Sequence, residues 1–486
     1  MKQKPFDTLQ RPLRCLLPVV LMTLLPLTAG AEIRLPQFFS SGMVLQQQTE
    51  VRLWGWADQL GEGTAGKNIS VTTSWNNRTY KARTDADGRF EVSVQTPSAG
   101  GPYTITYSDG KPLRLDNILI GEVWICSGQS NMEMQMKGFK GQPVEGAAEE
   151  LLQCNDTQLR LFYGKRKASL TPLADLAGTW QEASAPSVRE FSATAYYFGR
   201  ALRRSLGVPV GLICTAFGGS ACEAWMKADW LRAFPRVTLP WTEDDVKKLN
   251  QRCPTALFNG QLSPIIGFGM RGVIWYQGED NVPRYDYYAP LFVRMIEGWR
   301  EEWKQGAFPF YYCQIAPYDY TLIDWDVNSA LLREQQARVE QTVDNCRMAV
   351  LMDSGLEYGI HPRKKRQAGE RLALLALSNT YGVKGLPDFA AYNGQVEFHG
   401  DTAVVAFDRS KEWVYFENGP HSQNFEVAGE DRVFHPAETW IERNRVYVRS
   451  KEVEKPVAVR YAFRNWAVGD LMCDGLPVSS FRTDDW

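Results

Sequence analysis

Between residues 116 and 388, short apolar runs alternate with longer segments whose apolar residues recur at helical spacing. The runs are apolar throughout, which is typical of strands that are covered on both faces. Strands of this kind that alternate with amphipathic helices form a parallel sheet flanked by helices, so the sequence predicts an α/β domain here. The expected strands are 118–125, 208–215, 272–276, 308–315 and 348–352. The expected helices are 193–206, 288–304, 330–343 and 366–377.

The segments on either side of this domain have the pattern of β-structure. Residues 32–115 contain short alternating runs separated by turn signals, among them the Asp-Gly pair at 87–88. Short, evenly spaced strands are typical of a β-sandwich. Alternating runs return in residues 389–486. We therefore expect a β-sandwich-like domain over 32–115 and a β-rich domain over 389–486, one on each side of the α/β domain.

Residues 1–31 have the pattern of a secretory signal peptide. Basic residues precede an apolar run at 15–27, and small residues follow it up to Ala31. This is the order of segments in a cleavable signal. The run is short for a bilayer span and is interrupted twice by proline, although an uncleaved anchor is the alternative. We expect cleavage after Ala31, export to the periplasm or the outside, and no membrane insertion afterwards.

Charge and histidine content narrow the functional classes. The chain has 54 Lys and Arg against 56 Asp and Glu, a formal net charge of −2. Nucleic acids and anionic membranes bind concentrated basic surfaces, so neither partner is expected. Only four histidines are present, and no pair of them has the spacing of zinc ligands. The sequence therefore predicts no metal site.

Cysteine content leaves the question of disulfides open. Of nine cysteines, Cys15 lies in the predicted signal, which leaves 9 − 1 = 8 for an oxidising compartment. Their spacing is irregular and includes no Cys-x-x-Cys pair. Cys126 and Cys214 lie within apolar runs, where a buried unpaired thiol is the expected state.

Residues suited to catalysis follow three of the expected strands. In open α/β sheets, ligands bind beyond the carboxyl ends of the strands. Ser130 follows the first strand in the run GQSNM, where a tight turn would expose its hydroxyl and direct its own N–H into the same pocket. Gly218 and Gly219 follow the second strand, and Gln277 and Glu279 follow the third. Turn chemistry and a solvated loop are the alternative explanations for these residues.

One histidine is placed to serve as the general base for Ser130. His361 follows the strand expected at 348–352 and precedes a helix, which places it at the same edge of the sheet. The other histidines lie in the β-rich C-terminal region, where a surface or core role is expected: His399, His421 and His435.

The run GQSNM, with WYQGE at 275–279 and IHP at 360–362, resembles the sialate O-acetylesterases and related carbohydrate acetylesterases of the SGNH-hydrolase superfamily. The resemblance extends over nearly the whole mature chain. Further similar segments are GMVLQ at 42–46, WGW at 54–56, EAW at 223–225, FNG at 258–260 and FRTDDW at 481–486. The resemblance to this family implies an SGNH-hydrolase-like parallel sheet flanked by helices, with accessory β-domains at both sides.

The resemblance also implies a role for each site residue. Ser130 would be the nucleophile and His361 the general base of an acyl transfer that proceeds through an acetylated serine. Gly218 or Gly219 would supply a backbone N–H to the oxyanion, and Gln277 would donate its side-chain amide. The expected oxyanion- and substrate-binding residues are Gly218, Gly219, Gln277 and Asn131. Such a reaction requires neither a metal nor a cofactor.

One position departs from the pattern of the superfamily, which commonly places an Asp three residues before its His, or nearby. Here Tyr358 stands three residues before His361 and Gly359 stands two before it. The group that orients the imidazole must therefore be another acceptor or a backbone carbonyl. The candidates are Glu279, Glu357 and Asp353. We favour Glu279 as the orienting acid because it follows the same strand as Gln277.

The predicted function is hydrolysis of O-acetyl esters of sialic acids. Acetylated xylan or another plant glycan is the alternative substrate, and a non-catalytic carbohydrate-binding protein is the alternative of a different class. Trp124, Trp225 and Trp275 flank the site motifs and would stack on a sugar if exposed, although core packing is expected for Trp124 and Trp275. Arg333 is a candidate partner for a sialic acid carboxylate, and a solvated helix face is its alternative role.

Overall fold

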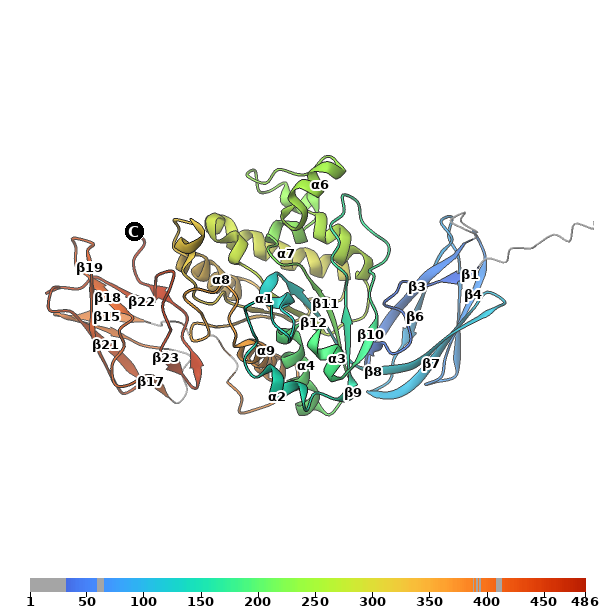
Figure 1. Ribbon diagram of the computed structural model, residues 1–486, viewed down its shortest axis with the longest axis horizontal. Helices are drawn as coiled ribbons and strands as arrows, with labels where there is room; N and C mark the ends of the chain where they lie inside the picture. The colour runs from blue at the N-terminus through green and yellow to red at the C-terminus, as the bar shows by residue number, and fades with distance from the viewer. Residues whose placement is uncertain (1–31, 59–64, 388, 390–391, 393–394, 408–412) are drawn as a thin grey trace, which may run out of the picture.

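The structure is a computed structural model that describes residues 32–58, 65–387, 389, 392, 395–407 and 413–486. An α/β unit occupies the centre of an elongated molecule, with β-structure at either end (Figure 1). The predicted signal peptide, residues 1–31, lies outside the described residues. The α/β class expected from the sequence is confirmed.

The central sheet has the strand order β10-β9-β11-β8-β12-β13-β14. Neighbouring strands from β9 to β14 are parallel, and β10 pairs antiparallel with β9 at one edge. The bounds are β8 Pro112–Gly128, β9 Asp156–Tyr163, β10 Trp180–Ala183, β11 Val210–Ala216, β12 Gly272–Tyr276, β13 Phe310–Cys313 and β14 Cys346–Ala349. In register, Gly128 lies opposite both Ala216 and Tyr276, so three strands end at the same level. All five expected strands are present, with ends shifted by a few residues.

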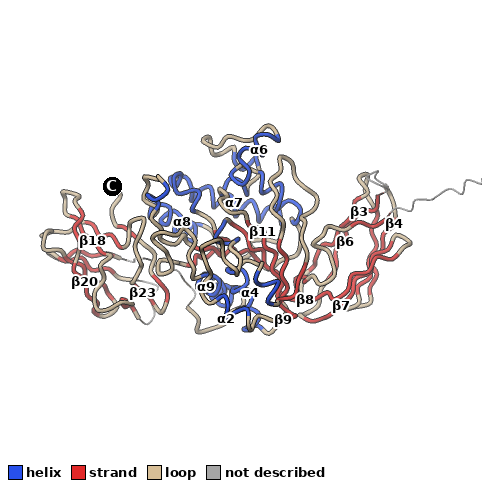
Figure 2. The backbone as a smooth tube through the Cα atoms, in the orientation of Figure 1, coloured by secondary structure: helices blue, strands red, loops and turns tan. Residues whose placement is uncertain are grey.

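Helices cover both faces of this sheet (Figure 2). The longer ones are α4 Ala193–Leu206, α7 Tyr288–Trp303, α8 Ala330–Thr342 and α9 Lys365–Asn379. The shorter ones are α1 Ser130–Glu133, α2 Ala147–Leu151, α3 Ala185–Arg189, α5 Ala228–Leu231 and α6 Glu243–Leu249. Phe198 of α4 and Leu372 of α9 share one core with Trp124, whereas Trp299 of α7 shares the other core with Trp275. Successive strand residues therefore point to opposite helical layers, which explains why the strands are apolar throughout.

Helix α4 shows how local sequence sets an element. The hydroxyl of Ser192 accepts a hydrogen bond from the N–H of Ala195 at 3.0 Å, which caps the first turn. Gly207 ends the helix in the left-handed region at φ 68°. The observed bounds equal those predicted because both signals stand directly next to the helix in the sequence.

The N-terminal region contains two small sheets. One has the order β1-β3-β6, and the other joins β2, β4, β5 and β7 to the first half of β8. The bounds are β1 Glu32–Arg34, β2 Val44–Gln46, β3 Glu50–Asp58, β4 Asn68–Thr73, β5 Arg78–Arg83, β6 Arg89–Gln95 and β7 Gly100–Ser108. The ring of Phe90 on β6 lies 6.2 Å from that of Tyr107 on β7, so the two sheets share a core. The expected boundary at 115/116 falls inside β8, whose first half pairs with β7 and whose second half pairs with β11 and β12.

The C-terminal region consists of short antiparallel strands in three sheets. Their bounds are β15 Val396–His399, β16 Thr402–Val405, β17 Val414–Phe416, β18 Phe425–Ala428, β19 Phe434–Pro436, β20 Glu438–Glu442, β21 Arg445–Arg449, β22 Ala458–Tyr461, β23 Leu471–Cys473, β24 Leu476–Pro477 and β25 Phe481–Arg482. Arg333 of α8 ties this region to the α/β unit. Its guanidinium donates to Ser480 Oγ at 3.0 Å and to the carbonyl of Arg464 at 2.6 Å.

The expected roles of Arg333 as a substrate partner or as part of a solvated face are therefore wrong. The side chain is fully buried, and burial lowers its pKa to about 10. Its guanidinium instead donates four hydrogen bonds to hydroxyls and carbonyls at the interface. It serves as a buried link between two regions of the chain.

All eight cysteines outside residues 1–31 are buried, and none of them forms a disulfide in the part of the chain that the structure describes. Cys126 and Cys214 are buried as expected. No helix among the described residues has the length and apolar character needed to cross a bilayer. No cluster of three or more metal-ligating side chains occurs among them.

Candidate active site

The candidate active site lies where β8, β11 and β12 end. The backbone N–H of Gln129 donates to the carbonyl of Tyr276 at 2.9 Å, which holds the turn after β8 against β12. Gly128 has φ +137°, and a Cβ atom built there would lie 2.2 Å from that same carbonyl oxygen. Only glycine fits so close an approach of two backbones. This requirement explains the first letter of the GQSNM run.

Ser130 begins α1 at this turn and is half-buried. Among the described residues, neither its hydroxyl nor its backbone N–H has a hydrogen-bond partner. The first N–H groups of a helix have no partner within it and are open to a ligand. Ser130 therefore offers a nucleophilic oxygen and an oxyanion donor on one residue.

The two glycines after β11 have different environments. The N–H of Gly218 donates to Glu133 Oε2 at 2.8 Å, and a Cβ built on Gly218 would lie 3.3 Å from the Cβ of Ser130. Gly219 has φ +71°, and its N–H has no partner within the described chain. Gly218 lies beside Ser130 as expected, and Gly219, the next residue, is the glycine of this pair whose N–H has no partner among the described residues.

Glu133 is a site residue that the sequence analysis did not single out. Its carboxylate is buried, accepts from the hydroxyl of Tyr163 at 3.2 Å and forms an ion pair with the half-exposed Arg166. Together with its bond to Gly218, these contacts hold the glycine turn against α1. Its position three residues after Ser130 is the only sequence signal, and such a position is common for a solvated helix carboxylate.

Gln277 lies at the predicted edge of the sheet, and its amide is fully buried. Both of its N–H groups have acceptors, the carbonyl of Ser220 at 3.1 Å and Oδ1 of Asn281 at 2.7 Å. Its Oε1 accepts from the hydroxyl of Tyr288 at 3.0 Å. In this structure the amide is thus directed away from an oxyanion and holds the loops after β11 and β12 together.

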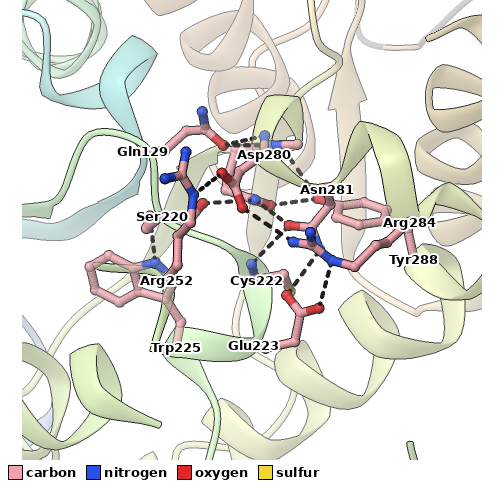
Figure 3. A network of polar contacts seen from close by, with 12 residues as sticks. Gln129, Ser220, Cys222, Glu223, Trp225, Arg252, Asp280, Asn281, Arg284 and Tyr288 are labelled. Atoms are coloured by element: carbon pink, nitrogen blue, oxygen red, sulfur yellow. Dashed lines mark hydrogen bonds and ion pairs between the residues drawn. The ribbon is translucent and has the colours of Figure 1, made fainter. Parts of the chain in front are cut away.

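A network of charged side chains also joins the loops that follow β11 and β12 (Figure 3). Asp280 accepts from Arg252 at 2.6 Å and from Arg284 at 3.2 Å. Glu223 lies 3.4 Å from Arg284 and accepts from the side-chain amide of Asn281 at 2.9 Å. Two buried carboxylates are therefore balanced by two arginines, which is the arrangement that buried charge requires.

Asn131 connects the serine turn with the segment that carries the histidine. Its Nδ2 donates to Glu279 Oε1 at 2.5 Å and to the backbone carbonyl of Ile360 at 3.1 Å. The ammonium group of Lys365 donates to its Oδ1. Ser130 and His361 are each one residue away from a partner in this network, so the two segments are fixed relative to each other.

The two charged partners of Asn131, Glu279 and Lys365, both have shifted pKa values. Burial raises the pKa of Glu279, whose second oxygen is buried without a partner among the described residues. Burial lowers the pKa of Lys365 to about 7. Lysine and glutamate therefore occupy one buried site with Asn131 between them. Shifts of this kind concentrate at functional sites.

His361 faces a cavity of about 260 Å³ that is also lined by Gln142, Glu357 and Tyr358. Its Nδ1 lies 2.5 Å from Oε1 of Gln142, and its ring packs edge-on against Phe139 at 5.1 Å. Burial and the positive charge of Lys365 lower the pKa of His361 to about 4. The imidazole is therefore neutral at neutral pH, as a general base must be.

The three candidate carboxylates for orienting His361 do not hydrogen bond to its imidazole among the described residues. Glu279 accepts from Asn131, and Asp353 forms a two-pronged ion pair with Arg371 at 2.6 and 2.7 Å. Glu357 lines the same cavity as His361. None of them hydrogen bonds to His361 in the part of the chain that the structure describes, nor does Ser130. Catalytic hydrogen bonds are often long without a bound substrate.

The tryptophans that flank the site motifs are fully buried: Trp124, Trp225 and Trp275. They pack in the two cores, which confirms the expectation for Trp124 and Trp275 and excludes sugar stacking for all three. Tyr358 is the exposed aromatic side chain beside His361, with 79% of its surface accessible.

Comparison with known proteins assigns the chain to a family. The model of the family described as "Carbohydrate esterase, sialic acid-specific acetylesterase" matches residues 120–378. The chain is 30% identical to the sialate O-acetylesterase of Rattus norvegicus over 444 residues, covering 76% of this chain and 78% of the relative. It is 29% identical to that of Homo sapiens over 411 residues, covering 74% and 73%.

A solved structure agrees with this assignment over most of the molecule. The structure of a carbohydrate acetylesterase from Xanthomonas citri superposes with a TM-score of 0.83 at 35% identity, covering 94% of this chain and all of that one. The matched family segment contains Ser130, Gly219 and His361. The chain thus belongs to the carbohydrate esterase family of sialic acid-specific acetylesterases and is a carboxylic-ester hydrolase.

Proposed function

We propose that this protein hydrolyses O-acetyl esters of sialic acids through an acetyl-serine intermediate on Ser130. The observation that carries the proposal is that the N–H groups of Ser130 and Gly219, at the ends of β8 and β11, and the hydroxyl of Ser130 all lack partners among the described residues. Donors arranged in this way stabilise the oxyanion that develops when a hydroxyl attacks an ester. The rat and human relatives named sialate O-acetylesterases support the choice of substrate.

The reaction follows from the chemistry of these groups. His361 Nε2 accepts the proton of the Ser130 hydroxyl while Oγ bonds to the acetyl carbon, and the carbonyl electron pair moves onto the oxyanion. The N–H groups of Ser130 and Gly219 hold that oxyanion. Its collapse breaks the bond to the sugar oxygen, which receives the proton from His361. Water, deprotonated by His361, then attacks the acetyl carbon, and acetate leaves as Ser130 regains a proton.

An arginine beside the glycine turn supports an acidic sugar as substrate. Arg252 donates from Nε to Asp280, and its two terminal nitrogens have no partner among the described residues. The side chain is 55% exposed, and one terminal nitrogen lies 3.8 Å from where a Cβ of Gly219 would stand. A planar guanidinium with free N–H groups matches the geometry of a carboxylate. We propose that Arg252 binds the substrate carboxylate.

The test is acetate release from an O-acetylated sialic acid, from an acetylated xylo-oligosaccharide and from p-nitrophenyl acetate. Acetate release by the wild-type enzyme should depend on Ser130 for every substrate that it hydrolyses. The value of kcat/KM should be highest for the sialic acid ester. Arg252→Gln should lower kcat/KM for the sialic acid ester by about tenfold and leave p-nitrophenyl acetate nearly unaffected. A preference for the xylo-oligosaccharide would establish the plant-glycan alternative, and full activity of Ser130→Ala would overturn the mechanism.

We further propose a domain organisation and a cellular location for the protein. The central sheet and its helices form an SGNH-hydrolase core, with accessory β-domains over 32–115 and 389–486. Residues 1–31 act as a cleaved signal that exports the enzyme to the periplasm or the outside. The N-terminal sequence of protein from the exported fraction should begin at Glu32, and an intact residue 1 in that fraction would contradict cleavage.

A further inference from the structure

The imidazole of His361 is held by an amide rather than by a carboxylate. Nδ1 lies 2.5 Å from the side-chain oxygen Oε1 of Gln142, 219 residues away in the sequence. Within the described residues, Gln142 is the hydrogen-bond partner of the ring, and no carboxylate oxygen bonds to it. The acceptor that a Ser-His pair usually finds in Asp is therefore supplied here by a neutral side chain.

A short hairpin holds Gln142 in this position. Phe139 and Gln142 exchange two backbone hydrogen bonds, at 3.0 and 2.9 Å, and Gly141 forms the turn between them at φ +74°. The ring of Phe139 packs against the imidazole itself. Beyond the hairpin, the N–H of Glu145 donates to the carbonyl of Arg363 at 3.0 Å. The segment that carries Gln142 is thus tied to the segment that carries His361 on both sides of their contact.

We propose that Gln142 is the positioning residue for His361 and takes the place of the orienting carboxylate. This inference rests on the proposed role of His361 as the general base. An amide oxygen can only accept, so Nδ1 must carry a hydrogen and Nε2 must carry the lone pair. That tautomer leaves the basic nitrogen free for the hydroxyl of Ser130.

A neutral acceptor has a second consequence, which distinguishes it from a carboxylate. It orients the ring but adds no negative charge that would favour the imidazolium. The charged and titratable groups around the ring are Lys365, which repels a proton on it, and Glu357, Tyr358 and Arg363, which line the same cavity. Burial, and then the charge of Lys365, hold the pKa of His361 low, at about 4. The enzyme should keep its base unprotonated well into the acidic range.

The experiment compares Gln142→Leu with Gln142→Glu in the full-length mature enzyme. Leucine fills the space and cannot accept a hydrogen bond, whereas glutamate accepts it and adds a charge. Acetate release from p-nitrophenyl acetate is measured between about pH 4 and about pH 9, which yields kcat, KM and the acid limb of kcat/KM. Gln153→Glu, on an exposed side chain, controls for the added charge. Side-chain ¹⁵N spectra report the tautomer, and His361→Ala identifies the resonance among four histidines.

We expect Gln142→Leu to lower kcat by about tenfold or more, to change KM by less than about threefold, and to lose the Nδ1–H tautomer. Gln142→Glu should keep kcat within about threefold of wild type and move the acid limb upward by about one pH unit or more, with no shift in Gln153→Glu. Unchanged kcat and tautomer in Gln142→Leu, or an unmoved acid limb in Gln142→Glu, would overturn this inference alone. Loss of the proposed function is recognised separately, by full activity of Ser130→Ala or His361→Ala.

Discussion

Asn131 donates a hydrogen bond to Glu279 across the edge of the sheet, with Nδ2 and Oε1 2.5 Å apart and both side chains buried. The same Nδ2 donates to the carbonyl of Ile360, next to the candidate base. One buried amide therefore joins the ends of β8 and β12 to the loop after β14. The position of the base relative to the nucleophile depends on that amide.

Asn131→Ala should weaken both stability and catalysis. The substitution leaves buried polar atoms of Glu279, Ile360 and Lys365 without their partner, at a cost on the order of 3 kcal/mol in the free energy of unfolding. We expect kcat to fall by at least about tenfold because the serine and histidine segments separate. Chemical denaturation and steady-state kinetics measure the two effects. Asn155→Ala, on the exposed surface, should change neither quantity.

Glu133→Ala should release the glycine turn. Without its carboxylate, Gly218 loses the acceptor of its N–H, and the turn that also contains Gly219 loses its anchor to α1. A fall in kcat of about tenfold or more with little change in KM is expected, since oxyanion contacts form mainly in the transition state. Glu133→Gln keeps an acceptor oxygen and should retain most of the activity. Equal losses in both variants would mean that charge pairing with Arg166, rather than the bond to Gly218, is what matters.

The free energy of unfolding should rise with pH across the range in which His361 is protonated in the unfolded chain but neutral in the folded protein. In the unfolded chain its pKa is about 6.5, and in the folded protein burial and Lys365 hold the pKa at about 4. Between these values the unfolded chain binds more protons, so acid favours unfolding. The contribution is at most about 3 kcal/mol, gained from about pH 4 to about pH 6.5. His361→Asn should flatten this part of the profile in denaturation experiments, and an unchanged slope would contradict it.

Lys365 should influence the acid limb of activity through the same imidazole. Its positive charge helps to lower the pKa of His361, so Lys365→Met should move the acid limb of kcat/KM toward higher pH. Loss of a buried cation also leaves Glu279 without its countercharge, and Glu279→Gln in the same chain should restore part of the lost stability. Strictly additive effects of the two substitutions on the free energy of unfolding would show that the two groups are independent.

Tyr358→Ala should weaken sugar binding without affecting the chemistry. The ring is exposed beside the cavity that His361 faces, and such a ring can stack on a pyranose. We expect KM for an acetylated sugar to rise about threefold to tenfold, with kcat for p-nitrophenyl acetate unchanged. Tyr358→Phe keeps the aromatic face and should behave as wild type. A fall in the turnover of both substrates would instead indicate a structural role.

Local signals explain why much of the fold is predictable. The bounds of α4 follow from the cap at Ser192 and the left-handed Gly207, which flank it directly, and the apolar strands reveal a sheet with two covered faces. The edge at which Ser130, Gly219 and His361 gather also follows, because parallel strands end on the same side. The domain boundary expected at 115/116 falls inside one continuous strand, because β8 changes its pairing partners midway along its length. The sequence of a strand does not specify which strands it pairs with, so this could not be predicted.

The partners of the site residues required the folded structure. Gln142 and His361 are 219 residues apart, Asn131 and Glu279 are 148 apart, and no spacing rule connects either pair. Arg333 has the sequence context of a surface residue, yet it lies buried between two regions of the chain. The sequence by itself determined which residue types stand at the ends of the strands, because that depends on short-range patterns. Tertiary structure decided which acceptor holds the imidazole and which glycine N–H stays free, because hydrogen bonds form between side chains that only long-range packing brings together.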